Sequence, residues 1–285
     1  YDNSIYALTQ HGSASFLTEL SMNGQFLDES GQAIITDFKM SDGYMYVITS
    51  TRLDILDARF SSHKNGVVGD VSNIPSEGGD GSALRKIAVS DDYVYVATNS
   101  NYHYVDGEYL TYSGGLLIVD VNDPTNPSLE GSYQYDANDI NQNGLGNAND
   151  IAVSGNHAYL AHDEGGLVIV DIRNPNNPTY AGRYNTPSPA SSVAVSDGTF
   201  PLQKRYVLVA TEDDGLIVVD AGKPSDPTYV GGYNTTGIPT DVAESGGTLP
   251  FQKRYAYVTT DSGELVVYEL PSSRWGTPFI ILLLT

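Results

Sequence analysis

The chain alternates short apolar runs with turns rich in glycine, proline and asparagine. The clearest runs are residues 114–120, 165–171 and 214–220, each with a Gly-Leu pair, further apolar residues and a closing aspartate. Apolar runs of this length between turn residues favour strands that are buried on both faces. Strand-like segments precede each run, as at 150–154 and 157–161. We therefore predict an all-β chain.

The apolar runs recur at a nearly constant interval. Their closing aspartates Asp120, Asp171 and Asp220 are 51 and 49 residues apart (171 − 120 and 220 − 171). A Pro-x-x-Pro turn follows each run, and then a short strand that ends in Gly-x-Tyr. Each unit thus offers four strands, and four strands in a period of roughly 40–50 residues are typical of β-propeller blades.

Weaker copies of the unit extend the repeat to both ends of the sequence. We predict one domain, a six-bladed β-propeller, with five or seven blades as alternatives. The first unit matches only the last three strands of the others, so the first blade lacks its inner strand. The predicted blades are approximately residues 1–30, 31–74, 81–136, 146–187, 188–236 and 237–285.

The apolar tail at 279–284 is too short for a membrane-spanning helix, which needs about 20 residues, so we expect a strand there and no transmembrane segment. Two places are open to this strand: the outer edge of the last blade, or the missing inner position of the first. Its unbroken apolar run favours the inner position. The same tail also suits strand exchange between subunits of a filament, which is the alternative to closure within one chain.

The repeated motifs resemble LVIVD repeats. The resemblance is carried by the Gly-Leu-x-(Ile/Val)-Val-Asp strands, the turns at 122–127 and 174–178, and the strand at 150–154. It is clear over residues 81–236 and weaker outside them. It implies a propeller and a secreted or surface-anchored protein of bacteria or archaea. No reaction comes with it, so function must be argued from individual sites.

Composition excludes several classes of function. The formal net charge is −21, from 35 acidic and 14 basic residues, which disfavours nucleic-acid binding because such proteins need Lys and Arg against phosphate. The absence of cysteine excludes disulfides, thiol catalysis and zinc–thiolate sites. No basic and apolar leader opens the sequence, which is consistent with a signal that has been removed.

Propeller topology sorts the charges onto two faces. One face receives the loops between second and third strands and between blades, which include the acidic segments 163–164, 212–214 and 136–150. The other face receives the Pro-x-x-Pro turns and the similar hairpins 199–205 and 248–254, which carry four of the 14 basic residues. Such a disc is suited to stacking face to face, and solvated turn charges are the alternative.

A calcium-like pattern lies between the third and fourth blades. Oxygen-bearing side chains recur at the spacing of a calcium loop, with Gly144 at the place of the sharp turn. Position 12 is an aspartate instead of the longer glutamate, and no helices flank the loop, so an ordinary turn is the alternative. The candidate Ca²⁺ ligands are Asp139, Asn141, Asn143, the Leu145 carbonyl, Asn147 and Asp150.

The third blade carries a tyrosine-rich insertion at 99–112. We predict that it forms a hairpin about Asp106-Gly107, a favoured pair for a tight turn. Exposed tyrosines on a projecting loop suit contact with a protein or a glycan at the cell surface. Packing against the neighbouring blade is the alternative. The candidate binding residues are Tyr102, Tyr104, Tyr109 and Tyr112.

The sequence offers little catalytic chemistry. Its five histidines are scattered, and His157 and His162 alternate to opposite sides of one strand. Asn234 begins a glycosylation sequon. We therefore expect a non-enzymatic binding, adhesion or self-assembly module outside the cell, with no catalytic residue. A carbohydrate-active enzyme that uses carboxylates of the channel is the rival hypothesis.

Overall fold

The computed structural model is all β over the residues that it describes, and it contains no helix among them. For the strands within 4–21, 101–112 and 279–284 only the backbone is described, and elsewhere the side chains are described as well. No described helix is long and apolar enough to cross a membrane. The described residues are 4–11, 14–21, 35–49, 52–58, 67–71, 84–99, 101–105, 108–112, 114–134, 146–196, 205–245, 254–270 and 279–284.

Twenty strands form five antiparallel sheets of four strands, one for each of the predicted units after the first. In every sheet the chain passes in order from an inner strand to an outer strand. The sheets are β3 (Asp37–Ser41), β4 (Tyr44–Ile48), β5 (Leu53–Asp57) and β6 (Val67–Val71); β7 (Leu84–Ser90), β8 (Tyr93–Thr98), β11 (Gly115–Asp120) and β12 (Ser128–Gln134); β13 (Ala148–Ser154), β14 (His157–His162), β15 (Gly166–Asp171) and β16 (Thr179–Tyr184); β17 (Ala190–Ser196), β18 (Tyr206–Thr211), β19 (Gly215–Asp220) and β20 (Thr228–Tyr233); and β21 (Pro239–Ser245), β22 (Tyr255–Thr260), β23 (Leu265–Glu269) and β24 (Phe279–Leu284).

Two further pairs of strands form hairpins. β1 (Ser4–His11) pairs with β2 (Ala14–Ser21) along its whole length and represents the first unit. β9 (Asn101–Val105) pairs with β10 (Glu108–Tyr112), with Val105 opposite Glu108. This register confirms the hairpin that we predicted about Asp106-Gly107.

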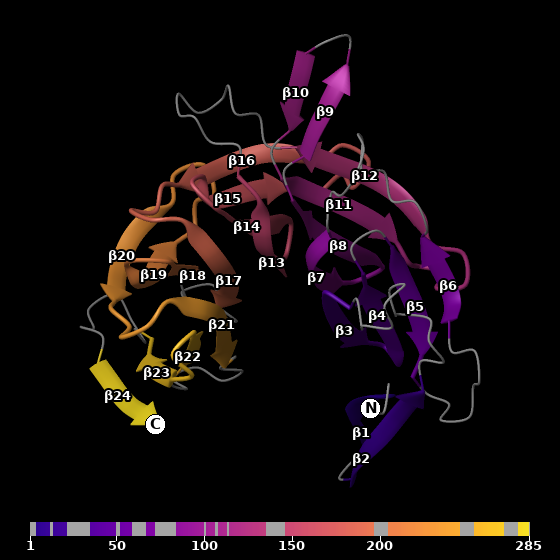
Figure 1. Cartoon of the computed structure of the whole chain (residues 1–285), viewed down its shortest axis with the longest axis horizontal. Coiled ribbons are helices and arrows are strands. Elements are labelled where there is room, and N and C mark those ends of the chain that lie inside the picture. Colours follow the sequence, from indigo (N-terminus) through magenta and orange to yellow (C-terminus); the bar gives the residue numbers. More distant parts are fainter. Residues whose placement is uncertain are drawn as a thin grey trace.

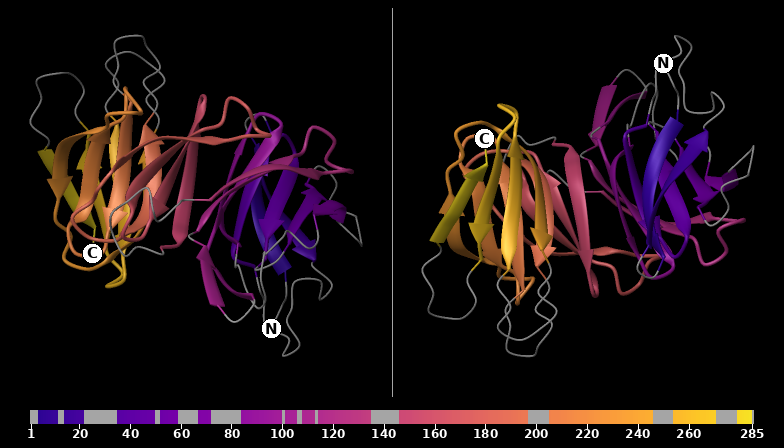
Figure 2. Two further views of the ribbon diagram at one scale, coloured as in Figure 1. Left: turned by 90° about the horizontal axis from the view of Figure 1, so that it is seen from above. Right: turned by 90° about the horizontal axis from the view of Figure 1, so that it is seen from below.

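The sheets follow one another around a central space, with the inner strands toward the centre and the outer strands on the circumference (Figure 1). Seen from the side, the strands of each sheet run between the two faces of the resulting disc (Figure 2). This arrangement is propeller-like. The ring is open between the β1–β2 hairpin and the sheet β21–β24 (Figure 1). Over the described residues, five units form complete four-stranded sheets and the first unit is represented by two strands.

The favoured place of the C-terminal strand was wrong. β24 is the outer strand of the last sheet, where it pairs antiparallel with β23 from Leu265 opposite Leu284 to Glu269 opposite Phe279. The register shifts between Val267 and Tyr268, as it does between the third and fourth strands of the other four complete sheets. The tail therefore repeats the outer-strand pairing of the other units, and this pairing satisfies the open edge of β23.

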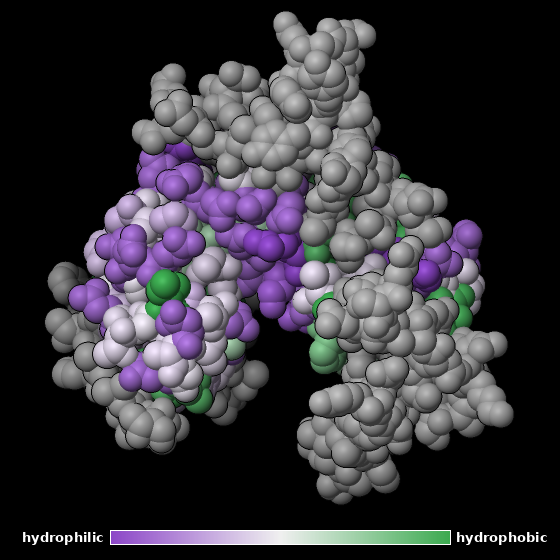
Figure 3. Space-filling model, viewed as in Figure 1, coloured by the Kyte–Doolittle hydropathy of each residue, from purple (hydrophilic) through white to green (hydrophobic). Residues whose placement is uncertain are grey.

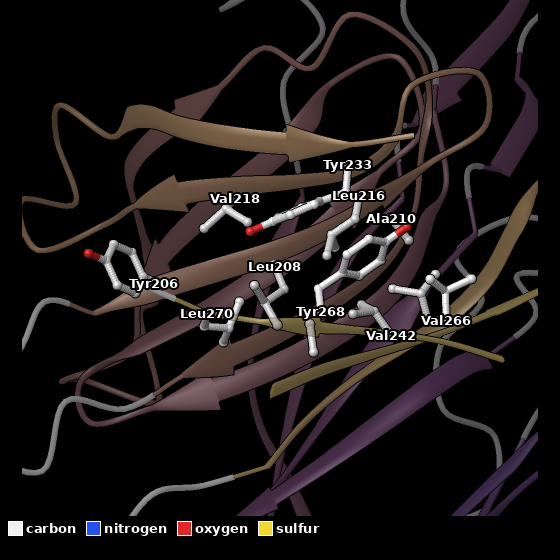
Figure 4. Close-up of a cluster of buried hydrophobic side chains, with 12 residues drawn as sticks. Tyr206, Leu208, Ala210, Leu216, Val218, Tyr233, Val242, Val266, Tyr268 and Leu270 are labelled. Carbon is white, nitrogen blue, oxygen red and sulfur yellow. The ribbon is translucent and has the colours of Figure 1, made fainter. Parts of the chain in front are cut away.

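Apolar side chains from both faces of each sheet bury themselves against the neighbouring sheets. In β18, Val207 and Val209 belong to the cluster shared with the preceding sheet, whereas Leu208 belongs to the cluster shared with the following one. Figure 4 shows this second cluster, in which Leu208 lies with Leu216 and Tyr268. The middle strands read as unbroken apolar runs because both of their faces are covered.

The Gly-x-Tyr strand and the Pro-x-x-Pro turn of the repeat meet between neighbouring sheets. A Cβ atom added to Gly182 in the outer strand β16 would lie 2.0 Å from the carbonyl oxygen of Pro224, in the turn of the following sheet. The same geometry brings Gly131 to the carbonyl of Pro175, at 2.1 Å. Glycine is required because the turn of one unit rests on the backbone of the one before it.

Gly182→Ala is expected to destabilise the fold, because the new methyl group collides with backbone that cannot move aside. Such overpacking costs about 1–3 kcal/mol in the free energy of unfolding, measurable by denaturant titration. Gly231 occupies the same place in β20, and an added Cβ there meets no atom within 4 Å. Gly231→Ala is therefore the matched control, and equal losses in the two variants would contradict the explanation.

Candidate functional site

The inner strands present the polar groups that border the central space (Figures 1 and 3). Their backbone amides donate to side chains of the preceding inner strand. The N–H of Ile87 donates to Asp37 Oδ2 at 3.0 Å, and the N–H of Val193 donates to Asp150 Oδ2 at 2.9 Å. The inner strands are edge strands, so alternate amides point away from the partner strand in their own sheet. A β-bulge also lies near the start of four of the inner strands. It shifts the register at Leu84/Lys86, Ala148/Asp150, Ala190/Ser192 and Pro239/Asp241.

The same contact recurs between the last two sheets, where the N–H of Val242 donates to Ser192 Oγ at 3.2 Å. It is absent between β7 and β13, because Lys86 occupies the acceptor position and an ammonium group cannot accept a hydrogen bond. There the N–H of Ile151 donates to Oδ1 of the adjacent Asp150 at 2.8 Å. We call this set of contacts the inner ladder.

Among the carboxylates of the inner ladder, Asp150 accepts three hydrogen bonds from backbone and side-chain donors. It is 9% exposed, and its Oδ2 also accepts from Ser192 Oγ at 2.6 Å. Burial raises the pKa of Asp150, while hydrogen bonds from Ser192 and Val193 oppose the increase. Both oxygens of this side chain are occupied: Oδ2 by contacts that join two sheets, and Oδ1 by the amide of the adjacent Ile151.

Other acidic residues fasten the loops between sheets. Asp163 Oδ2 accepts the N–H of Asn147 at 2.8 Å and its Nδ2 at 3.1 Å. Asp261 Oδ1 accepts the N–H of Ile238 in the same way at 2.9 Å. The equivalent residue in the sheet between them is Pro189, which has no N–H to cap. Part of the acidic face thus serves as hydrogen-bond acceptors for loop backbone.

The arginines that end the two similar hairpins lie between sheets. Arg254 is 5% exposed, donates through Nη1 to Ser196 Oγ at 2.6 Å, and lies 5.3 Å from the centroid of the Tyr206 ring. Arg205 donates to Tyr159 Oη at 3.4 Å. We had expected these charges on the face of the disc that carries the Pro-x-x-Pro turns. Both guanidinium groups instead contact residues of the preceding sheet. The two lysines of the hairpins lie outside the described residues.

The candidate calcium loop is described only at its end. Asp139, Asn141, Asn143 and Leu145 lie outside the described residues. Asn147 and Asp150 are described, and they take part in the loop cap and the inner ladder. Within the described part of the chain, no three His, Asp or Glu side chains are grouped as metal ligands.

The candidate tyrosines lie on the projecting β9–β10 hairpin. Tyr104 is opposite Tyr109, and Tyr102 is opposite Thr111, so the strand register assigns these three tyrosines to one face of the hairpin. The same register assigns Tyr112 to the other face. In the β20–β21 loop, Asn234 is exposed, and its carbonyl accepts a hydrogen bond from Tyr268 Oη at 3.2 Å.

His162 is a polar site that the sequence analysis overlooked. The side chain is fully buried, and its Nε2 lies 3.2 Å from the carbonyl oxygen of Gly114 in the preceding sheet. Added Cβ atoms would lie 2.9 Å from the ring at Gly146 and 2.7 Å from it at Gly165. The signal was present in the repeat, because threonine occupies this place in the other four complete sheets, at Thr49, Thr98, Thr211 and Thr260.

Burial lowers the pKa of His162, while the contact with Gly114 and the charge of Asp163 oppose the change. The folded protein thus binds this proton less readily than the unfolded chain does. The free energy of unfolding should therefore fall as the pH drops below roughly 6.5, by at most about 1.4 kcal/mol per pH unit from this group.

His162→Thr, which installs the residue of the other sheets, should weaken this acid-side loss of stability. Urea titrations at about pH 7 and about pH 5 measure it, as the difference between wild type and variant. His157→Tyr, which installs the residue found at Tyr206 and Tyr255, is the control and should have less effect because His157 is less buried. Identical pH profiles for wild type and His162→Thr would contradict the assignment.

A known repeat family matches the four-stranded units of this chain. The LVIVD repeat model matches residues 80–106, 101–135, 145–186 and 189–235. No curated protein matches the sequence. Two solved structures of computationally designed proteins are similar at 12% identity: Ika4, with a TM-score of 0.46 over 68% of this chain and 95% of its own, and Ika8, with a TM-score of 0.49 over 94% and 78%.

The repeat model covers half of the chain, and its matches contain every strand of the sheets β7-β8-β11-β12, β13–β16 and β17–β20. Outside the matches, β3–β6 and β21–β24 have the same strand order and the same inter-sheet contacts. The chain belongs to the LVIVD-repeat family.

Proposed function

We propose that this chain is a non-enzymatic binding or assembly module that acts outside the cell or at its surface. Its ring is a six-bladed propeller, completed when the first sheet covers the last. The observation that carries the proposal is the uncovered face of the last sheet. Tyr257, Leu265 and Val267 are partly exposed there, while their counterparts in the preceding sheet, Leu208, Leu216 and Val218, are at most 1% exposed.

An apolar sheet face of this kind favours association, because its burial removes hydrocarbon from water. The β1–β2 hairpin of the same chain is the favoured cover, since a tethered segment meets the face at a high effective concentration. The same hairpin from a second copy would link copies head to tail into a filament. Both covers use one surface, so one experiment separates them.

The use of the described carboxylates supports binding over catalysis. Asp37 and Asp150 accept backbone amides of the following sheet, and Asp163 caps a loop. A glycosidase needs two carboxyl groups that both face the scissile bond. The rival hypothesis of a carbohydrate-active enzyme is tested by a polysaccharide activity screen.

The projecting β9–β10 hairpin is the proposed contact for a surface protein or glycan, because three of its tyrosines share a face by register (Figure 1). Asn234 is the proposed glycosylation site, in keeping with its exposure. The resemblance to LVIVD repeats is what supports the proposed extracellular setting.

Cross-linking distinguishes ring closure from head-to-tail assembly. The chain has no cysteine, so Ile5→Cys with Val267→Cys gives an unambiguous pair. Ile5 in β1 is the counterpart of Met45 in β4. The buried cluster that contains Met45 is separate from the cluster that its sheet shares with the following sheet. A short bismaleimide should yield a cross-linked monomer, whereas a ladder of multimers on a denaturing gel would indicate assembly.

The matched control pairs Val267→Cys with Leu129→Cys, which is 37% exposed on the outer strand β12. It should give no intramolecular product. Failure of the Ile5–Val267 pair to form either product would overturn both the closure and the assembly versions of the proposal.

Calcium is proposed to stiffen the loop at 139–147. Added Ca²⁺ should raise the melting temperature of the wild type, and excess chelator should reverse the increase. Asp139→Ala should abolish the calcium-dependent increase without changing the chelated protein. Asp150→Ala is the contrasting variant: it should lower the melting temperature under both conditions, because losing a buried acceptor costs about 1–3 kcal/mol. A wild-type transition that is unchanged by chelator contradicts the calcium proposal.

A further inference from the structure

The boundary between the first unit and the sheet β3–β6 differs in its chemistry from the other boundaries. At each boundary between complete sheets, one residue from the third strand of either sheet enters a shared apolar cluster. The four pairs are Ile55 with Leu117, Ile118 with Val168, Ile169 with Ile217, and Val218 with Val266. At the first boundary the equivalent positions are acidic, with Glu19 in β2 and Asp54 in β5.

The strand pairing fixes the position of Glu19. It is opposite Tyr6 in β1, as Ile55 is opposite Tyr46 in β4. Ile55 and Tyr46 both enter the cluster that β3–β6 shares with the following sheet. The equivalent face of the β1–β2 hairpin is therefore the one directed to β3–β6, the sheet that follows it around the ring (Figures 1 and 2).

Asp54 is a buried carboxylate on an otherwise apolar face. It is 0% exposed, and so are Met45 and Val47 on the same side of the sheet. Arg52 Nη2 donates to Asp54 Oδ1, but among the described residues neither Asp54 Oδ2 nor Arg52 Nε has a hydrogen-bond partner. The guanidinium group thus serves one oxygen of the carboxylate. Its second oxygen is buried without a donor, which costs stability unless a donor or a cation meets it.

A second described carboxylate shares the face of Asp54. Asp70 in the outer strand β6 is directly opposite Asp54, and such residues in antiparallel strands have Cβ atoms roughly 4.5–5.5 Å apart. Asp70 is exposed, so the pair extends from the buried boundary to solvent. Burial raises the pKa of Asp54, Arg52 opposes the increase, and the charge of Asp70 adds to it. The ionised pair is therefore stabilised by a further positive charge.

We propose that this boundary is a calcium site built on Asp54 and Asp70, with Glu19 as the acidic residue that the first unit contributes by its register. The three carboxylates and the single guanidinium group of Arg52 leave an excess of two negative charges, which one divalent cation neutralises. Bound there, Ca²⁺ would fasten the β1–β2 hairpin to the rest of the ring.

The donor atoms favour a hard cation. Carboxylate oxygens are typical ligands of Ca²⁺, which takes six to eight oxygens in a flexible geometry, and the exposed side at Asp70 admits water to the remaining positions. The other four boundaries have apolar residues at the positions of Glu19 and Asp54. The site is thus particular to the first boundary, and it depends neither on the loop at 139–147 nor on closure of the ring.

Equilibrium dialysis counts the Ca²⁺ ions bound to each chain. If the loop at 139–147 and this boundary each hold one ion, the wild type binds two. Asp54→Val installs the residue that Val168 supplies in β15, and it should lose the boundary ion while keeping the loop ion. An unchanged count in Asp54→Val overturns the proposal, and Asp54 then serves only its ion pair with Arg52.

Asp139→Ala separates this inference from the proposed calcium loop. The variant should still bind one ion, and this ion should be absent from the double variant with Asp54→Val. Loss of all calcium in Asp139→Ala contradicts the boundary site and leaves the loop proposal standing. A wild type that binds a single ion, retained in Asp139→Ala and lost in Asp54→Val, supports the boundary site and contradicts the loop.

Two surface variants control for folding and for general attraction of cations by an acidic protein. Asp70→Asn changes an exposed residue, so it should melt like the wild type in excess chelator, and it should bind the boundary ion about tenfold more weakly. Glu212→Gln removes an equally exposed negative charge from another sheet and should leave binding unchanged. Equal calcium affinities in these two variants overturn the site.

Discussion

Every complete sheet of this protein is apolar on both faces, and this constraint governs the rest of the structure. A four-stranded sheet of this kind cannot be stable alone, so each must lie between two others. β18 illustrates the requirement, since alternate side chains of one unbroken apolar run enter clusters with the preceding and the following sheet. The sheets in the middle of the series are covered on both faces, whereas the first and last complete sheets, β3–β6 and β21–β24, keep exposed apolar residues.

Stacking sheets around a centre creates a second requirement at their edges. The inner edge carries amides that face polar space, and these amides donate hydrogen bonds to Asp37, Asp150 or Ser192 of the neighbouring inner strand. The outer edge brings the turn of one unit against the glycine of the preceding strand, as at Gly182 and Pro224. Polar residues that look like binding or catalytic residues in the sequence thus join neighbouring sheets. The surfaces left for function are those of the first and last sheets, which are not covered by a neighbour.

The buried His162 shows how one unit departs from the common pattern. An imidazole replaces the threonine of the other units, and Gly146 and Gly165 of the same unit make room for it. Substitution within a repeat therefore places an imidazole, whose pKa burial lowers, at one boundary between sheets where the other units have a hydroxyl. Arg254 is a similar case, because burial against Tyr206 and Ser196 turns a loop charge into a contact between sheets.

The sequence by itself determined the strands, their order and the family, because short apolar runs, turn residues and the repeat interval are local properties of the chain. The β9–β10 hairpin followed from Asp106-Gly107 for the same reason. Only the tertiary structure decided the place of β24, the role of Asp150 and the burial of Arg254. The apolar tail fits either sheet edge by composition, and an aspartate is equally compatible with a metal, a channel or a neighbouring amide. Those choices depend on which groups meet between neighbouring sheets, as Asp150 and Val193 do although they are 43 residues apart along the chain. The spacing of residues along one strand carries no information about such contacts.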